Sequence, residues 1–416
     1  MHIGNGINDD TNYLQELLDS GKRHVYFPQP KVCYTISRPL VIHSNTSLVL
    51  DRFTEIKLKA GSDCIMLKNA DDRDGNENIS ISGGIWNFNN KEQAPNPICT
   101  NEGREPFMLP NKSEYFSDLY LGVALRFSHV KNLTLKALTV KDPATFGIQI
   151  GFVEYFTISD ITFDYNLGNP IALNMDGVHL DGGCRYGHIE NIKGTTHDDL
   201  VAINADDFAS GPISDITVNG VYSESCHSAV RLLSVYYPVK NISVSNVYGS
   251  FYRYAICISK FYETEEVRGS FSNLVFKNIA VSKAPLLPKY GVGKWITCAP
   301  LHIGENIDID VLSIENLSRH EMVSPVESIY IGENTNIGVL STRDCVQHNL
   351  LDHPDYVKGV GYKDDINELR ERNKNTNDMP FLVNKGTIRH LNFAGINTEE
   401  TLLMNDGTIH NQTVQY

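Results

Sequence analysis

The sequence predicts an all-β protein whose chain winds into a parallel β-helix, a solenoid in which successive coils stack on one another. Three observations lead to this fold class. A short apolar motif recurs along the chain, its copies lie roughly 20 to 40 residues apart, and each copy alternates apolar and polar residues. Spacing of this size is typical of solenoids, and alternation with period 2 indicates strands rather than helices.

The recurring motif has the form apolar-x-apolar-x-x-apolar and is dominated by β-branched residues. Its central apolar residues, which we expect to point into the solenoid core, are Leu135, Ile158, Ile189, Val218, Val244, Phe276 and Ile314. Their unequal spacing fits coils whose loops vary in length while the core strands keep their register. A sharp corner within the motif calls for residues that tolerate a left-handed backbone, and the candidates are Asn191, Asn219, Asn246, Asn278 and Asn316.

A second strand can be aligned in five of the coils. Its copies occupy residues 147–150, 177–180, 200–203, 229–232 and 255–258. The positions expected to point inward are uniformly aliphatic, as Ile148, Val178 and Val201 illustrate, whereas the positions between them are mixed. If each repeat of the motif forms one coil, this alignment places Asp176 directly above or below Asp199.

The remaining segments are expected to cap or interrupt the solenoid, which we take to be a single domain over residues 1–416. Residues 7–30 are predicted to form an N-terminal cap, in which an amphipathic helix shields the first coil. Residues 89–120 and 346–380 are polar excursions that would wall a cleft or join subunits. Coil-like runs then resume, so residues 381–416 are predicted to be closing strands.

Composition narrows the function classes. The chain has 416 residues and a net charge of −14, which argues against nucleic acid or an acidic membrane as a partner. No apolar run is long enough to span a bilayer and no signal peptide is evident, so we expect a cytoplasmic protein if the chain is complete and a secreted one if it was trimmed. The eight cysteines show no CxxC spacing, which favours buried thiols over disulfides or zinc. We expect no metal and no cofactor.

Three aspartates form the candidate catalytic group. Asp176 and the pair Asp198 and Asp199 each stand at the start of a predicted strand, and stacked strands lie roughly 4.8 Å apart. Carboxylates held that close raise the pKa of at least one of them, which produces an acid beside a base. A single aspartate at a strand start more often caps a turn, and we expect Asp206 and Asp207 to form such a solvated turn.

The motifs NMDG (174–177) and HDD (197–199), together with the run NLTLKAL (132–138) before them, resemble the polygalacturonase-like glycoside hydrolases of family 28, in the pectin-lyase-like β-helix superfamily. The resemblance covers roughly residues 4 to 280. It implies a right-handed, single-stranded β-helix and hydrolysis with inversion at a glycosidic bond. It also implies that Asp176, Asp198 and Asp199 supply the acid and the base, with Met175 in place of the family's usual threonine.

Two departures from the family pattern bear on the substrate. His227 stands near the expected GHG motif without its glycines, and the RIK motif that grips a galacturonate carboxylate is replaced by CIS at 257–259. Lys260 is adjacent and Arg231 is one coil away, so an altered carboxylate-binding site is expected. The candidate substrate-binding residues are His179, His227, Arg231, Tyr254 and Lys260, with His179 and Arg231 lining the sugar subsites.

The resulting hypothesis is an inverting hydrolase of a plant or microbial oligosaccharide or polysaccharide. Asp199, between two other acids, would be the general acid, while Asp176 and Asp198 would hold and deprotonate the water. Two alternatives stay open: a β-helix lyase, epimerase or fructan transferase, and a non-catalytic carbohydrate-binding appendage protein. The sugar, the linkage, endo or exo action and the formation of homo-oligomers also stay open.

Overall fold

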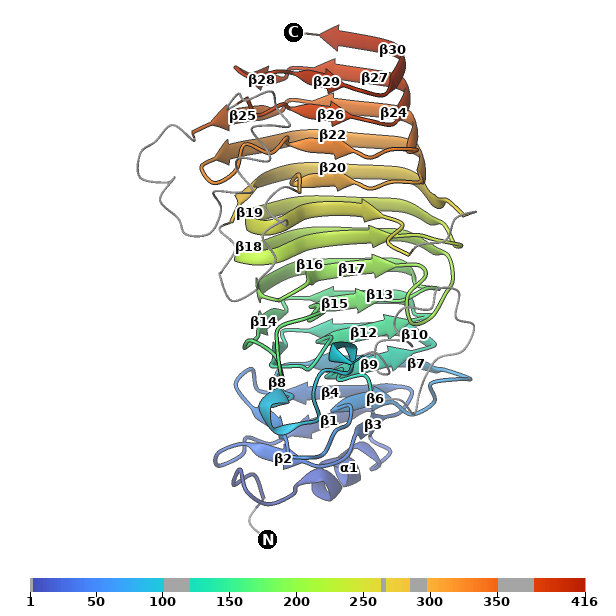
Figure 1. The fold of residues 1–416 in the computed structure, drawn as a ribbon. Coiled ribbons are helices and arrows are strands. Elements are labelled where there is room, and N and C mark those ends of the chain that lie inside the picture. Colours follow the sequence, from blue (N-terminus) through green and yellow to red (C-terminus); the bar gives the residue numbers. More distant parts are fainter. Residues whose placement is uncertain (1–2, 101–119, 263–266, 285–297, 351–377, 416) are drawn as a thin grey trace. The chain divides into compact units, whose positions relative to one another are not determined.

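The computed structural model describes residues 3–100, 120–262, 267–284, 298–350 and 378–415. These residues form two compact units, 1–216 and 217–416, and each is described by itself. Strands dominate both units, and within each unit successive strands run side by side (Figure 1). Whether the chain is one domain, as the sequence suggests, stays a prediction.

In the first unit, successive coils contribute strands to three parallel stacks. The first stack contains β3 (Leu40–Ile42), β6 (Leu67–Asn69), β9 (Leu125–Ser128), β12 (Ile148–Gly151), β15 (Val178–Leu180) and β17 (Asp199–Asn204). The second contains β1 (His24–Phe27), β4 (Thr46–Leu50), β7 (Asn76–Ser82), β10 (Val130–Lys136), β13 (Glu154–Ser159) and the start of β16 (Arg185–Thr195). The third contains β2 (Tyr34–Ile36), β5 (Glu55–Leu58), β8 (Ile85–Asn87), β11 (Thr139–Lys141), β14 (Thr162–Asp164) and the end of β16.

The register of the first stack follows from alternation in the sequence. Ile148 pairs with Val178, and Val178 pairs with Val201. All three side chains are fully buried. A one-residue slip would turn the whole aliphatic set outward, so the burial of these side chains fixes the register. The parallel β-helix prediction and the predicted alignment of these strands are therefore confirmed.

Corner residues adopt the left-handed backbone that the sequence predicts, with one exception. Asn191, Asn246, Asn278 and Asn316 all have φ between 53° and 57°. In the second unit, the amide of Asn278 donates to Asn246 at 3.1 Å, and the amide of Asn316 donates to Asn278 at 3.0 Å. The prediction for Asn219 is wrong, because the next residue, Gly220, takes the positive φ in that coil. Glycine adopts this backbone without a steric penalty.

The N-terminal cap contains the helix α1 (Thr11–Leu18), beside β1 and β3 at one end of the first unit (Figure 1). Leu14 and Leu18 are buried, which places the apolar stripe of the helix against the end of the first coils. The Asp10 carboxylate accepts hydrogen bonds from the backbone of Gly4 and Thr35, at 3.1 Å each. The capping helix is therefore confirmed.

The second unit also consists of parallel strands, several of which are longer than those of the first unit. β18 (Ile213–Leu233) lies mostly in this unit, and the following strands pair in parallel. They are β19 (Val239–Ser259), β20 (Gly269–Lys283), β21 (Leu301–Ile303), β22 (Ile307–Glu321), β23 (Ile329–Ile331), β24 (Asn336–Arg343), β25 (Val346–Asn349), β26 (Leu382–Asn384), β27 (Thr387–Ala394), β28 (Asn397–Thr398), β29 (Leu403–Asn405) and β30 (Thr408–Gln415). Strands thus occupy most of the segment 381–416.

The two predicted excursions are described in part. The first contains the short 3₁₀ helices η1 (Asn90–Glu92) and η2 (Pro97–Cys99), and its residues 101–119 lie outside the described part. The second was expected to begin at residue 346, but β25 extends the coil to Asn349, and residues 351–377 lie outside the described part. No disulfide joins the eight cysteines, all of which are described. No helix among the described residues has the length and apolar character that crossing a membrane requires.

Candidate active site

Asp176 and Asp199 occupy neighbouring coils of the first unit. Asp176 lies two residues before β15 begins, Asp199 opens β17, and the Gly177 amide donates to the Asp199 carbonyl at 2.8 Å. The Asp176 carboxylate oxygen Oδ1 in turn accepts the Asp199 amide hydrogen at 3.2 Å. The vertical alignment that the sequence predicts for these two aspartates is thus present. Both are buried, with 3% and 2% of their surface exposed, and Asp198 beside them is more exposed.

Close packing fixes the backbone that carries Asp176. The Tyr165 hydroxyl donates to the Asp176 carbonyl at 2.9 Å. Gly177 needs to be glycine, because a Cβ there would lie 2.5 Å from the Leu200 carbonyl oxygen and 2.5 Å from the Phe163 ring. Both distances are far inside van der Waals contact, so the coil can approach its neighbour only without a side chain at this position.

His179 connects Asp176 to further acids. Its Nδ1 lies 2.7 Å from Asp176 Oδ2, and its Nε2 lies 3.3 Å from Asp181 Oδ1 and 3.6 Å from Asp207 Oδ2. Burial by itself would lower the pKa of this imidazole, but the hydrogen bonds and charges of Asp176 and Asp181 raise it well above its usual value. We expected His179 to line a sugar subsite; instead it is 1% exposed and holds the Asp176 carboxylate.

Asp181 and Asp207 were missed as parts of this site. Asp181 is fully buried, and it accepts hydrogen bonds from the Gln149 amide at 2.9 Å and from the Phe208 backbone at 3.1 Å. The Asn204 amide donates to Asp207 at 3.0 Å. The expectation of a solvated turn is wrong for Asp206, which is fully buried, and Asp207 is largely buried. Alternation could have pointed to Asp181, because it follows His179 by two residues.

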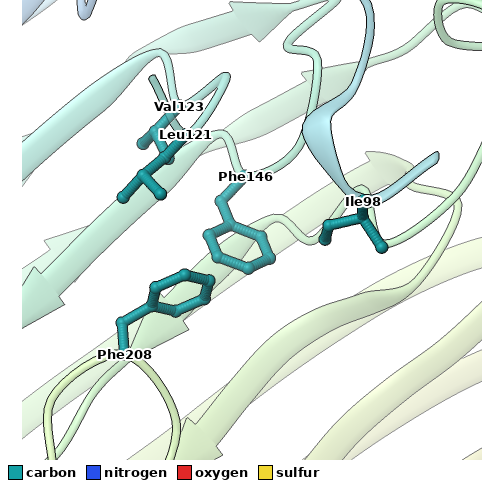
Figure 2. Packing of buried hydrophobic residues seen from close by; sticks show 5 residues of the cluster. All are labelled: Ile98, Leu121, Val123, Phe146 and Phe208. Carbon is teal, nitrogen blue, oxygen red and sulfur yellow. The ribbon is translucent and has the colours of Figure 1, made fainter. Parts of the chain in front are cut away.

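An apolar cluster covers His179. The Phe146 ring stacks on the imidazole with centroids 4.0 Å apart and planes 12° apart, and the Phe208 ring meets it edge-on at 6.0 Å. Figure 2 shows these two phenylalanines with Ile98, Leu121 and Val123, which complete the cluster. Because these residues come from separate segments of the first unit, tertiary folding closes this outward face of the strands to solvent.

The four other predicted binding residues belong to the second unit. His227 is buried, its Nδ1 lies 2.9 Å from the Ser228 hydroxyl, and its Nε2 lies 3.5 Å from Arg253 Nη1. Arg231 is half-buried; its Nε donates to the Ser259 hydroxyl at 3.3 Å, and its guanidinium carbon lies 4.7 Å from the centre of the ring of Phe261.

Tyr254 and Lys260 are less accessible than the sequence suggested. Tyr254 was expected to offer a stacking face or hydroxyl, but it is buried and its ring contacts Arg253 at 4.7 Å and His302 at 5.1 Å. Burial also raises the pKa of its phenol well above the usual value. Lys260 is buried too, and burial together with the nearby Arg268 charge lowers the pKa of its ammonium group.

Residues 120–285 match the family model described as glycosyl hydrolases family 28. The chain carries a glycosyl hydrolase family 28 domain. Asp176, Asp198 and Asp199 all lie inside this domain, as do His179 and the four binding candidates of the second unit. No curated protein sequence matches the chain.

Solved structures similar to this chain are β-helix proteins. The family 28 exopolygalacturonase of Yersinia enterocolitica has 12% identity, a TM-score of 0.54, and an alignment over 99% of this chain and 76% of its own. A double mutant of the tailspike protein of E. coli bacteriophage HK620 has 12% identity, a TM-score of 0.57, and coverage of 97% and 75%. Another mutant of that tailspike, solved with a pentasaccharide, has 12% identity, a TM-score of 0.55, and coverage of 97% and 62%. At this identity the likeness concerns the fold.

Proposed function

We propose that the family 28 domain makes this chain an inverting glycoside hydrolase with Asp176, Asp198 and Asp199 as its catalytic residues. The observation that carries the proposal is the register of the first stack, which holds the Asp176 carboxylate against the backbone of Asp199 at 3.2 Å. Asp198 adds a more exposed carboxylate beside this pair. Three acids in such a small region are unfavourable for stability, and a glycosidase uses that arrangement.

The proposed chemistry needs one protonated and one ionised carboxyl group, about 6.5–9.5 Å apart with a water between the base and the sugar. His179 and the Asp199 amide both donate to Asp176, and hydrogen bonds to the charged form favour an ionised carboxylate. Asp176, with Asp198, is therefore assigned to hold and deprotonate the water. Asp199 is assigned as the general acid that protonates the leaving oxygen.

The proposed substrate is an oligosaccharide or polysaccharide bound through an altered carboxylate site. Arg231 and Lys260 supply positive charge in the second unit, but the Arg231 guanidinium already contacts Ser259 and Phe261, and Lys260 is buried. Arg231 is our candidate for binding an anionic group, because it is only half-buried and a guanidinium can bind a carboxylate through two parallel hydrogen bonds.

The test is a substrate screen of the wild-type protein and its Asp199→Asn variant against galacturonides, rhamnosides, galactosides and xylosides. We expect turnover of one class by the wild type and none by the variant. Proton NMR of the first product should show the anomeric configuration inverted. Retention of configuration would contradict the mechanism while leaving the fold unaffected.

Non-catalytic glycan binding is the second candidate, because a tailspike of the same fold was solved with a pentasaccharide. In that case the wild type would bind a sugar without any turnover, and Asp176→Asn would leave binding unchanged. A lyase would instead give an unsaturated product that absorbs in the ultraviolet. These three outcomes are distinct in one set of assays.

A further inference from the structure

Two exposed tyrosines stack on each other on the second strand stack of the first unit. Tyr155 of β13 is 51% exposed and Tyr186 of β16 is 42% exposed. Their ring centroids lie 5.0 Å apart and their planes differ by 20°. The register brings them together, since the residues on either side of Tyr155 pair with those on either side of Tyr186.

The backbone at these tyrosines shows that the corner itself does not call for them. Their φ angles are 56° and 59°, a region that bulky residues rarely adopt. The same corner in the preceding coils is occupied by Asn45, Asn78 and Asn132, also with positive φ. Each asparagine amide donates to the one before it, at 2.9 Å in both cases. Tyrosine stands where the preceding coils have an asparagine, a residue that suits this backbone and continues the series of amide hydrogen bonds. This exchange indicates a role for the tyrosine ring.

The charged side chains next to the tyrosines alternate in sign from coil to coil. Lys131, Glu154 and Arg185 are register neighbours in three successive coils. Arg185 Nη2 lies 2.6 Å from Glu154 Oε1, and its guanidinium carbon lies 5.5 Å from the centre of the Tyr186 ring. The surface therefore offers aromatic rings and paired hydrogen-bonding groups with alternating charge. It fits a neutral, hydroxyl-rich ligand better than a polyanion, whose binding would compete with Glu154 for Arg185.

We propose that Tyr155 and Tyr186 form a surface site that binds a neutral polysaccharide chain, separate from the three catalytic aspartates. The apolar faces of sugar rings would rest on the tyrosine rings, while hydroxyl groups would hydrogen-bond Arg185 and Glu154. Only the ligand class rests on the proposed function. Such a site would keep a polymer attached to the protein without taking part in bond cleavage.

The test is affinity electrophoresis in native gels containing galactan, xylan or polygalacturonate. All variants carry Asp199→Asn, so that turnover does not remove the polymer. We expect galactan or xylan to retard the parent protein, and Tyr155→Asn with Tyr186→Asn to weaken binding at least about fivefold. Asparagine suits the corner, so these substitutions should preserve folding. Tyr26→Asn, which removes a half-exposed tyrosine elsewhere in the unit, is the matched control and should retain retardation.

Several outcomes would overturn the proposal: no retardation by galactan or xylan, retardation by polygalacturonate alone, or equal retardation of the double-tyrosine variant. A dimer in light scattering that this variant loses would show instead that the tyrosines join two copies of the chain. Because the gel assay needs no catalysis, its result is independent of whether the substrate screen finds turnover.

Discussion

Replacing His179 with glutamine should destabilise the first unit strongly. The imidazole ring is 1% exposed and lies 2.7 Å from Asp176 and 3.3 Å from Asp181, whose hydrogen bonds and charges favour its protonated form. Removing one member of a buried ion pair costs about 3–5 kcal/mol, because the carboxylates that remain are buried without compensation. Losing the ring that stacks on Phe146 adds about 1 kcal/mol. Equilibrium unfolding in urea at pH 6 measures the difference, and exposed His188→Gln is the control, expected within about 0.5 kcal/mol of wild type.

The effect of this substitution should depend on pH in a defined direction. Although burial opposes protonation, Asp176 and Asp181 raise the folded-state pKa of His179 above the unfolded value of about 6.5. The stabilisation is therefore fully present below about pH 6.5 and is lost as the pH rises through the folded-state pKa. Asp207 is the third carboxylate that faces the ring, and the other groups packed against it are the uncharged rings of Phe146 and Phe208. The difference in unfolding free energy between wild type and variant should shrink at alkaline pH.

Catalysis gives an independent readout of the same residue. If His179 keeps Asp176 ionised and oriented, then His179→Gln should lower kcat while KM changes little, because both ring nitrogens face carboxylates of the protein rather than a substrate. Nitrogen NMR of labelled histidine should also show a protonated ring at pH 7. A neutral ring at that pH, or a variant as stable as His188→Gln, would refute the account of a buried imidazolium.

Three further predictions concern other parts of the chain. Asp176→Asn and Asp199→Asn should each reduce kcat by at least about 10²-fold with sugar binding retained, measured by product formation and calorimetry; equal loss of binding would contradict their catalytic assignment. Burial lowers the pKa of the Lys283 ammonium to about 8, so the unfolded chain binds more protons above that pH and stability should rise between pH 8 and about 10.5. Lys283→Met should reduce this rise of the unfolding free energy with pH, measured by urea unfolding. An unchanged pH dependence in the variant would contradict the assignment to Lys283. Gly177→Ala should lower the melting temperature by several degrees, because the new Cβ would meet its neighbours at 2.5 Å; an unchanged melting temperature would show that the coils can move apart.

Much of the fold followed from local sequence because a solenoid brings each coil against its sequence neighbours. Alternation at Ile148, Val178 and Val201 predicted both the strands and their register. Corner chemistry was predictable to within one residue, since asparagine and glycine both tolerate a positive φ. That tolerance is also why the sequence could not choose between Asn219 and Gly220.

The candidate active site, too, was predictable in part from the sequence. Register alone predicted that Asp176 would neighbour Asp199, and the structure has that contact. The burial of His179 was not predictable, because the rings that cover it, those of Phe146 and Phe208, come from other segments of the chain. An alternating pattern predicts that a side chain points outward from the strand. It does not predict whether that side chain meets solvent or another segment of the chain.

The sequence by itself therefore determined the winding of the chain and the alignment of Asp176 with Asp199. Both depend on the alternation of apolar and polar residues within each coil, which is visible in a short stretch of sequence. Tertiary structure decided which outward side chains stay accessible. It enclosed His179, Asp181 and Tyr254, and it left Tyr155 and Tyr186 in solvent. The physical reason is that accessibility depends on where loops of unequal length fold back, and their own residues carry no periodic signal of that position.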